Sequence, residues 1–565
     1  MSSSIRIGRV LPGVFFLTLL IAVADLSAQA IPDPNGAFST TPTAVSVPNY
    51  TVPAPGPAND AEWNKPEALA KNLQAVARQT SSNYYSINFI WVLGAAFLVM
   101  FMQAGFALIE TGLCRAKNAA HSMSLNFLIY AIGITGFFIC GFAFMCGGVN
   151  GTSIGGPASL GGLPTLDQMV TVGDGWGILG KTGFFLSGSA YDARVAVWFL
   201  FMMVFMDTTA TIPTGACAER LSFKSFFLFS LFIGMFTFPV FACWVWGGGW
   251  LAQLGPKLAM AHGAVDFAGA GVVHLQGGVI ALVLTSMLGP RIGKYDSKGN
   301  PQPIIGHDVP MVLLGTLILA FGWFGMNCGN ALGASDGRIA IIAVNTALSS
   351  GAATLTACLL VWCFLGKPDP SLTSNGMLAG LVAISGPCAF VSPASAFLIG
   401  IVAGILVITG IFVIEKAGID DAVGAVSVHG INGLWGLIAL GLLADGTYGA
   451  GWNGCHLFRL TDGSLGYFND VAKAPAGAIE MGITGLFYGN GKQLVVELIL
   501  AAVAIIWNAA MAAIIFGIVG KATRSNRVSP EVEIAGLDIP EMGAPGYPDF
   551  INAVAPEQVQ PSEYQ

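Results

Sequence analysis

The sequence has few charged residues for its length. Only 10% of its 565 residues are Asp, Glu, Lys or Arg, whereas a soluble globular domain carries roughly 25%. This deficit, together with a hydrophobic content of 54%, excludes an ordinary soluble protein and indicates a membrane protein. The net charge of -7 provides no basic surface of the kind that nucleic-acid binding requires.

The sequence also lacks cysteines with the spacing of metal ligands or of disulfides. Of the ten cysteines, nine lie in or at the edges of apolar segments, and only Cys455 falls in a long polar loop. We therefore expect neither a disulfide framework nor a metal site. Glycine, in contrast, is abundant at 74 residues, and small residues allow the helices of a membrane bundle to approach closely.

The N-terminus has the pattern of a secretory signal peptide. Arg6 and Arg9 precede the apolar run LPGVFFLTLLIAVA, and SAQA offers a cleavage site that ends at Ala30. The apolar run is shorter than the roughly 20 residues of a spanning helix. We expect residues 1–30 to be removed, the mature N-terminus to lie outside, and residues 31–85 to form an extracytoplasmic segment.

Apolar segments of spanning length follow, and residues 86–520 are expected to form an all-α transmembrane domain in the cell membrane. The eleven predicted spans lie near 87–110, 124–147, 192–214, 224–250, 267–288, 309–330, 339–364, 373–391, 394–415, 427–445 and 493–520. An odd number of spans places the termini on opposite sides. Lys and Arg are concentrated in the loops expected inside, which agrees with a cytoplasmic tail over 521–565.

Two stretches share the pattern D-x-x-G-A-x-x-V-H-x-x-x-G and open the fifth and tenth spans. They are DFAGAGVVHLQGG at 266–278 and DAVGAVSVHGING at 421–433. Because the two spans are five helices apart, they run in opposite directions. The pattern therefore indicates an inverted repeat of spans 1–5 and 6–10, with a site near the midplane.

Each copy of the repeat carries one histidine, eight residues after an aspartate. Asp266 and Asp421 stand where their helices begin and are expected to cap free backbone N–H groups. His274 and His429 lie about 12 Å further in, so antiparallel packing would bring the imidazoles together. A lone buried histidine is usually structural. Two at equal depth in paired helices favour a path for a small polar species or for protons.

These stretches belong to a longer series of motifs that resembles the Amt/Mep/Rh ammonium transporter family, on its Amt side. The series includes FMQAGFALIETGLCRAKNAAHSM, GACAERLSFKS, VWGGGW, GWFGMNCGN, VHGINGLWG and RVSPEVEIAGLDIPEMGAPGYP. The resemblance implies a homotrimer of eleven-helix protomers in the membrane lipid, each with its own pore for ammonium or ammonia. It implies a transporter and not an enzyme, and no cofactor is expected. A PII-type regulatory protein is implied as a partner at the cytoplasmic face.

The resemblance further implies an outer vestibule that holds NH4+ against aromatic rings. Phe201 and Trp246 match this cage, which attracts the cation through its ring faces. Asp266 matches an acidic residue linked to cation recruitment as well as to capping. Asn330 stands where a serine usually completes the cage, and its carbonyl is an alternative acceptor.

Below the cage the resemblance implies a gate of two stacked phenylalanines and then a pore. Phe205 matches the first gate residue, and Met326 replaces the second with a flexible apolar side chain. His274 and His429 match the twin histidines of the pore. The implied mechanism deprotonates NH4+, conducts NH3 and moves the proton separately.

Two alternatives remain open at this point. The departures at Met326 and Asn330 leave room for an ammonium sensor that binds without transporting, although no signalling domain follows the last span. A passive gas channel of the Rh kind is the other alternative, against which the tail motif favours the Amt side.

Several further features are expected to be structural. The long loops 148–191 and 446–491 are rich in Gly, Asp and Asn and are expected outside. GWGILGKT, within the first of them, fits a phosphate-binding motif, but its place between two spans excludes that role. His121, His262 and His307 fall in loops or at span edges, where solvated polar roles are expected.

Overall fold

The computed structural model describes residues 66–149, 158–160, 162–163, 165–468 and 471–548. The predicted signal peptide, residues 1–30, lies outside the described residues. Two compact units are present. One comprises the chain up to Ser82 with Trp362–Lys367, and the other comprises Asn83–Val361 with the chain from Pro368 on.

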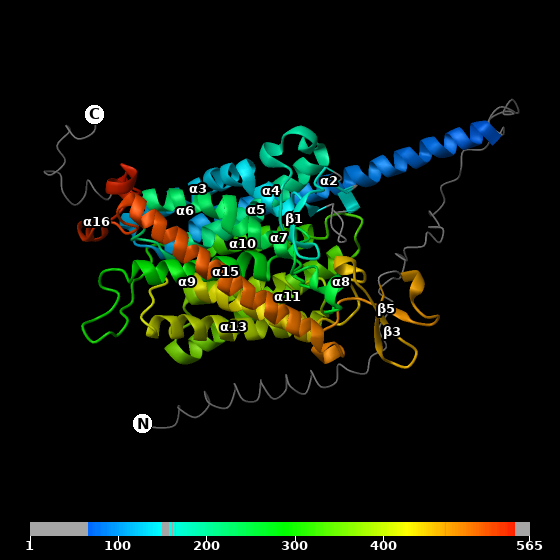
Figure 1. Cartoon of the computed structure of the whole chain (residues 1–565). Helices are drawn as coiled ribbons and strands as arrows, with labels where there is room; N and C mark the ends of the chain where they lie inside the picture. The colour runs from blue at the N-terminus through cyan, green and yellow to red at the C-terminus, as the bar shows by residue number, and fades with distance from the viewer. Residues whose placement is uncertain (1–65, 150–157, 161, 164, 469–470, 549–565) are drawn as a thin grey trace, which may run out of the picture. The chain divides into compact units, whose positions relative to one another are not determined.

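The larger unit is a bundle of helices, in which the chain crosses back and forth between two ends (Figure 1). The long helical segments of the described chain, of which α2 and α11 extend into the smaller unit, are α2 (Pro66–Leu113), α3 (Ala119–Gly136) with α4 (Phe142–Cys146), α5 (Ala193–Ala216), α6 (Phe223–Phe232) with α7 (Phe238–Val245), η10 (Ala270–Leu275) with α9 (Gln276–Leu288), α10 (Val309–Gly329), α11 (Arg338–Leu365), α12 (Pro370–Ser385), α13 (Pro393–Lys416), η11 (Val426–Ile431) with α14 (Asn432–Leu443), and α15 (Gly491–Thr523). Single π-helical turns, η4 (Phe137–Gly141) and η9 (Ile233–Thr237), join α3 to α4 and α6 to α7.

Within the described residues, ten helical segments are long and apolar enough to cross a membrane. They correspond to ten of the eleven predicted spans. The eighth prediction, 373–391, falls on α12, which has 16 residues. The count of eleven therefore stays a prediction.

Helix starts follow the expected capping chemistry. Asp308, Asp369, Ser392 and Ser529 each accept a hydrogen bond from a backbone N–H of the helix that they precede. A proline stands in the first turn of each of these helices, where its missing N–H costs nothing. These caps fix where the connecting loops end and the apolar segments begin.

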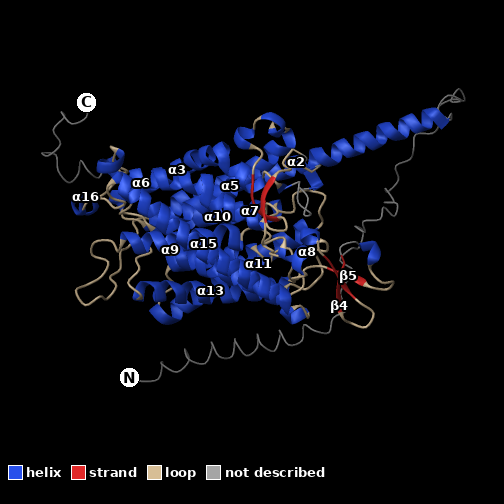
Figure 2. Cartoon of the chain, viewed as in Figure 1, coloured by secondary structure: helices blue, strands red, loops and turns tan. Residues whose placement is uncertain are grey.

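Two features of the secondary structure were not predicted. The first long helix, α2, begins at Pro66 instead of near residue 87, because PEALAKNLQAV starts with proline and continues with helix formers. The long loops 148–191 and 446–491 contain small antiparallel sheets. One consists of β1 (Met169–Val172) with β2 (Trp176–Gly180), and the other consists of β4 (Leu465–Phe468), β3 (His456–Arg459) and β5 (Ile479–Met481) in that order. Figure 2 shows how little of the chain these strands occupy beside the helices.

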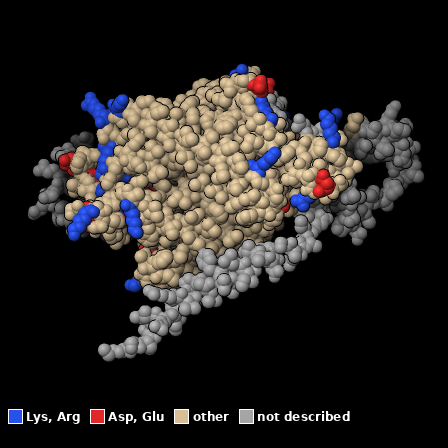
Figure 3. Space-filling model, turned by 60° about the horizontal axis from the view of Figure 1, so that its bottom comes forward, with Lys and Arg blue, Asp and Glu red and all other residues tan. Residues whose placement is uncertain are grey.

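The surface of the bundle is apolar over a wide area. Large apolar side chains on α10, α11 and α15, among them Leu317, Leu355 and Ile506, are more than half exposed. Figure 3 shows charged side chains mainly toward the two ends of the bundle, with a broad uncharged region between them. Exposed apolar area on this scale marks a surface covered by lipid or by another chain.

The C-terminal segment lies against loops at one end of the bundle, which we call the tail face. Here α16 (Pro530–Ala535) and η15 (Asp538–Met542) follow α15. Backbone N–H groups of Ile292, His121 and Phe223 donate to the carboxylates of Glu533, Asp538 and Glu541, respectively, and the Leu537 N–H donates to the Asn118 side chain. The tail is thus held by the loops that follow α2, α5 and α9.

A buried ion-pair cluster holds these loops together at the tail face. Asp420 accepts two hydrogen bonds from the Arg291 guanidinium, at 2.8 and 2.9 Å, and a third from the Arg291 backbone N–H. Glu219 pairs with Arg115 at 2.7 Å and with Arg291 at 3.4 Å. Burial opposes the charge of Asp420, but the hydrogen bonds from Arg291 outweigh it and lower the pKa of Asp420 to about 2. The pair therefore stabilises the fold at neutral pH, and that contribution is lost as the pH falls from about 4 toward 2.

In the interior, the two helical segments that carry the histidines, η10 with α9 and η11 with α14, pass each other at the distance of backbone contact. A Cβ placed on Gly278 would lie 2.2 Å from the backbone nitrogen of Gly430, and one placed on Gly433 would lie 2.6 Å from that of Leu275. The contacts are reciprocal, because each glycine is four residues past its own histidine and meets the residue directly after the other histidine. This reciprocity supports a two-fold relation between the halves of the chain.

We predict that Asp420→Asn lowers the free energy of unfolding by roughly 3–5 kcal/mol at neutral pH, because it leaves Arg291 buried beside a neutral group. Thermal unfolding of the purified protein in detergent measures the change. Asp336→Asn is the matched control: its pair with Arg338 is partly exposed and should contribute less than about 1 kcal/mol. Equal midpoints for the two variants would contradict the importance of the cluster.

We further predict that Gly278→Ala destabilises the protein by about 1–3 kcal/mol or more, since the new methyl group meets fixed backbone. Gly351→Ala serves as the control, because Gly351 is also helical and a Cβ there would meet nothing within 4 Å. The control should be neutral or slightly stabilising. The yield of folded protein and its thermal midpoint report both effects, and an unchanged Gly278→Ala variant would show that the helices can separate freely.

Candidate functional site

The two repeat histidines meet in the interior. The Nδ1 atoms of His274 and His429 are 3.2 Å apart, and the rings are nearly parallel, with centroids 5.2 Å apart and an angle of 21° between planes. Both side chains are buried. The aspartates cap as predicted: Asp266 accepts four backbone N–H groups, those of residues 269–272, and Asp421 accepts those of Gly424 and Val426.

The contact between the two Nδ1 atoms restricts the protonation of the pair. One Nδ1 must carry the hydrogen and the other must accept it, so the two neutral rings are in opposite tautomers. A second proton between the facing nitrogens would place two N–H groups against each other. The pair therefore holds at most one positive charge, and a proton can pass from one ring to the other along the shared hydrogen bond.

Two aromatic side chains that the sequence did not identify enclose the pair. Trp323 stacks on His274, with centroids 5.0 Å apart and 19° between planes, and Phe106 lies 6.1 Å from His429. The Trp323 indole N–H donates to Ser385 Oγ at 2.9 Å, which fixes the ring. Trp323 lies in the motif GWFGMNCGN, but nothing in its local pattern indicates a histidine as the neighbour.

The predicted cage and gate aromatics form a continuous column. Phe201 and Phe205, one turn apart on α5, have ring centroids 4.9 Å apart, and Phe205 meets Trp246 edge-on at 5.6 Å. Phe201 and Phe205 are fully buried, whereas Trp246 is partly exposed. The structure thus brings these three predicted residues together, with Trp246 as the member that reaches solvent.

Trp246 and Asp266 are joined through the backbone. The Trp246 indole N–H donates to the carbonyl oxygen of Asp266 at 2.6 Å, and the ring edge lies 3.4 Å from the Cβ position of Gly269. Both carboxylate oxygens of Asp266 are already used by the η10 N–H groups. Asp266 therefore acts structurally as a cap that fixes the tryptophan and the start of η10.

The two departures from the family pattern lie at the end of α10. Met326 is fully buried, and the Asn330 side-chain amide donates to the Met326 carbonyl oxygen at 2.7 Å. Between them, Gly329 packs on the ring of Phe201, within 3.1 Å of a Cβ position. The end of α10 therefore borders the aromatic column, and the amide oxygen of Asn330 stays available as an acceptor.

The prediction for two other histidines was wrong. His121 and His262 are fully buried instead of solvated, and their ring nitrogens have no hydrogen-bond partner within the described part of the chain. Burial lowers the pKa of His262 to about 4, so this ring is neutral. The third, His307, is partly buried and bonds Tyr547 of the tail. Local polarity suggested solvated positions here, but the tail lies against His121 and the loop 446–491 lies against His262.

A buried polar network on α2, α3 and α5 also escaped the sequence reasoning. Glu110 accepts from the Asn126 amide at 2.6 Å and from the Thr214 hydroxyl at 2.9 Å, and Gln103 donates to Thr211 at 2.8 Å. Glu110 lies four residues past Phe106 on the same helix face. An acidic side chain inside a spanning helix requires such partners, because a bare charge there is costly.

Comparisons with known proteins agree with the motifs. A model of the Ammonium Transporter Family matches residues 90–547. The ammonium transporter Amt2 of Archaeoglobus fulgidus is 43% identical over 468 residues, which cover 82% of this chain and 89% of that protein. The ammonium transporter Amt1 of Haloferax mediterranei is 33% identical, with 84% of this chain and 81% of that protein covered.

Solved structures show the same relationship in three dimensions. A structure named Sensor Amt Protein is 31% identical, with a TM-score of 0.66, and covers 82% of this chain and 100% of its own. Mep2 of Candida albicans, at 24% identity and a TM-score of 0.62, shares the fold over 79% of this chain and 87% of its own. The resemblance drawn from the motifs is confirmed. The chain belongs to the ammonium transporter family, whose members are transporters and not enzymes.

Proposed function

We propose that the protein takes up ammonium by conducting NH3 through a pore that passes the histidine pair, while the proton moves separately. The observation that carries the proposal is the Nδ1 contact of His274 and His429 in a buried, aromatic-lined interior. A hydrogen-bonded pair of neutral imidazoles can exchange hydrogen bonds with a small polar guest and can pass on a proton. A pair of residues that served packing alone would not need to be two titratable rings joined by a hydrogen bond.

Ammonium is recruited at the outer end of the aromatic column in this proposal. The partly exposed Trp246 presents a ring face to the cation, a contact that contributes roughly 0.5–2 kcal/mol depending on desolvation. Phe201 and the Asn330 oxygen complete the binding site, and Phe205 with Met326 closes the path below it. These assignments rest on the column geometry and on family membership.

The proton must leave before the nitrogen enters the apolar segment. Carrying a charge to the centre of the bilayer costs at least ~2.5 kcal/mol. NH4+ avoids this cost by dissociating at the vestibule into NH3 and a proton, and the proton then travels separately, partly along the hydrogen bond that the two histidines share. Potassium has no proton to lose and would have to cross as an ion, which accounts for selectivity.

The proposed setting is the cell membrane, with the signal peptide removed, the mature N-terminus outside and the tail face in the cytoplasm. The concentration of Arg115, Arg220, Arg291 and Lys294 at the tail face supports this orientation. The protein is proposed to form a homotrimer, with the tail face open to a PII-type regulator. Sensing is the second candidate function, favoured by the likeness to Sensor Amt Protein and by the changes at Met326 and Asn330.

We predict that His274→Ala abolishes sustained charge translocation. An ammonium pulse applied to reconstituted protein on a solid-supported membrane should drive a sustained current in the wild type, reduced at least roughly tenfold in the variant, because loss of one general acid–base group typically costs that much or more. His456→Ala, on β3 and paired with Glu480 away from the pore, should behave as the wild type. Transient, binding-sized signals from the wild type would favour sensing, whereas a wild-type current in His274→Ala would refute the relay.

We predict that Trp246→Leu raises the half-saturating ammonium concentration by roughly 2- to 30-fold, since it removes the cation–π contact. Trp250→Leu is the matched control, because Trp250 packs on Trp244 and lies outside the column. The concentration dependence of the current measures both variants. Unchanged affinity in Trp246→Leu would show that ammonium binds elsewhere.

A further inference from the structure

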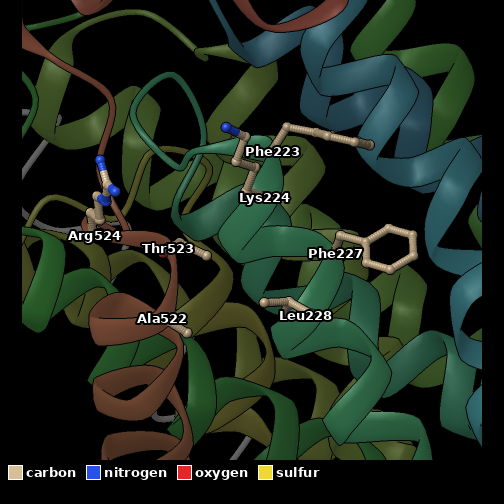
Figure 4. Close-up of a pocket in the computed structure, with 7 residues that line it drawn as sticks. All are labelled: Phe223, Lys224, Phe227, Leu228, Ala522, Thr523 and Arg524. Atoms are coloured by element: carbon tan, nitrogen blue, oxygen red, sulfur yellow. The ribbon is translucent and has the colours of Figure 1, made fainter.

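A pocket opens on the surface of the bundle where α6 begins and α15 ends, at the tail face. Its volume is about 520 Å³, and it is lined by Phe223, Lys224, Phe227, Leu228, Ala522, Thr523 and Arg524 (Figure 4). The two helices are packed together behind it, with the rings of Phe229 and Phe516 5.5 Å apart. The pocket is separate from the histidine pair and from the aromatic column, and no step proposed for transport uses it.

Two cationic side chains on the pocket wall are uncompensated. Lys224 and Arg524 are exposed, and neither side chain forms a hydrogen bond or ion pair with any residue that the structure describes. Two arginines of the tail face are, in contrast, matched to carboxylates: Arg291 to Asp420 and Arg527 to Glu533. None of the seven lining residues is acidic, so the pocket presents net positive charge.

The rest of the wall is apolar and continues along the outside of the bundle. Phe227 is 44% exposed, and Leu228 lies one turn further from the tail face than Lys224. On α15, Ile514 and Ile518 are also more than half exposed, so an apolar strip leads away from the pocket toward the bundle middle. Cationic groups thus stand at the end of a path that lipid chains would cover.

We propose that this pocket binds one anionic phospholipid of the surrounding bilayer. The phosphate lies between Lys224 and Arg524, and an acyl chain lies over Phe227 and Leu228. A guanidinium binds phosphate through two parallel N–H donors, and juxtamembrane Lys and Arg attract anionic headgroups. A free phosphate ion would satisfy the charges but would leave the apolar strip uncovered, which favours a lipid. This site does not depend on whether the protein transports or senses ammonium.

The bound lipid would also act on the start of the tail. The Thr523 hydroxyl donates to the Ser525 carbonyl oxygen and lies 3.0 Å from Ser225 Oγ, so the pocket floor joins α6 to the residues that follow α15. Arg524 itself has a left-handed backbone, with φ of 71°, at the point where the chain leaves the helix. A headgroup held by Arg524 therefore fixes this turn.

Native mass spectrometry of the detergent-purified protein tests the site by titration with phosphatidylglycerol and, separately, phosphatidylcholine. The wild type should bind one phosphatidylglycerol in preference to phosphatidylcholine. The double variant Lys224→Gln/Arg524→Gln should weaken that binding by about 25-fold, since each basic group near an anionic headgroup contributes about a factor of five. Lys298→Gln/Lys416→Gln removes the same charge from exposed residues outside the pocket and should keep wild-type binding.

A second variant separates shape from charge. Ala522→Trp fills the pocket, keeps both cations and should also weaken phosphatidylglycerol binding, while size-exclusion profiles and thermal midpoints confirm that each variant is folded. Equal lipid binding in the wild type and both pocket variants would overturn the proposal. An equal loss of phosphatidylglycerol binding in the Lys298/Lys416 control would also overturn it, because general surface charge would then account for the binding. Displacement of the lipid by millimolar inorganic phosphate would identify a phosphate site and overturn the lipid as occupant.

Discussion

The backbone contact between the two histidine-bearing segments, η10 with α9 and η11 with α14, is the constraint on which the site depends. Two helices can pass at this distance only where one of them presents a residue without a side chain to the backbone of the other, and Gly278 and Gly433 supply the two places. The π-helical turns then set the rotation of each histidine, because a hydrogen bond from residue i to i−5 shifts the following side chains around the axis. The His274 N–H bonds Gly269 in this way. Without the close crossing, the two Nδ1 atoms would not share a hydrogen bond.

Polar groups elsewhere in the bundle are arranged so that few charges face apolar surroundings. The carboxylates of the capping aspartates accept hydrogen bonds from helix N–H groups. The strongest ion pairs, such as Arg291 with Asp420, lie at the tail face. Glu110, Asp207 and Glu497 are buried inside helices; amide and hydroxyl groups donate to Glu110, and the Gln493 amide donates to Glu497. The strongest ion pairs that fix the helices therefore lie at one end of the bundle, and the surroundings of the histidine pair are mainly aromatic and apolar.

Sequence periodicity and composition were sufficient for most of the scaffold. Ten apolar segments, the paired aspartate–histidine motifs and the caps follow from patterns within one helix, and the structure confirms them. Contacts between distant segments could not be predicted in this way. Trp323 stacks on His274 although the two residues are 49 positions apart in the chain, and the burial of His121 depends on the tail. The π-helical turns were also missed, because one extra residue in a turn leaves hydrophobic composition unchanged.

The reciprocity of the two glycine contacts has a consequence for how such a chain can evolve. If the halves descend from a duplicated ancestor, each half supplies one glycine and also the backbone segment that packs against the glycine of the other half. A bulkier residue in one copy cannot be absorbed locally, because the surface it strikes belongs to the sister copy and is main chain. The halves can diverge freely at their lipid-facing and loop positions. At this crossing, however, both halves must keep a glycine.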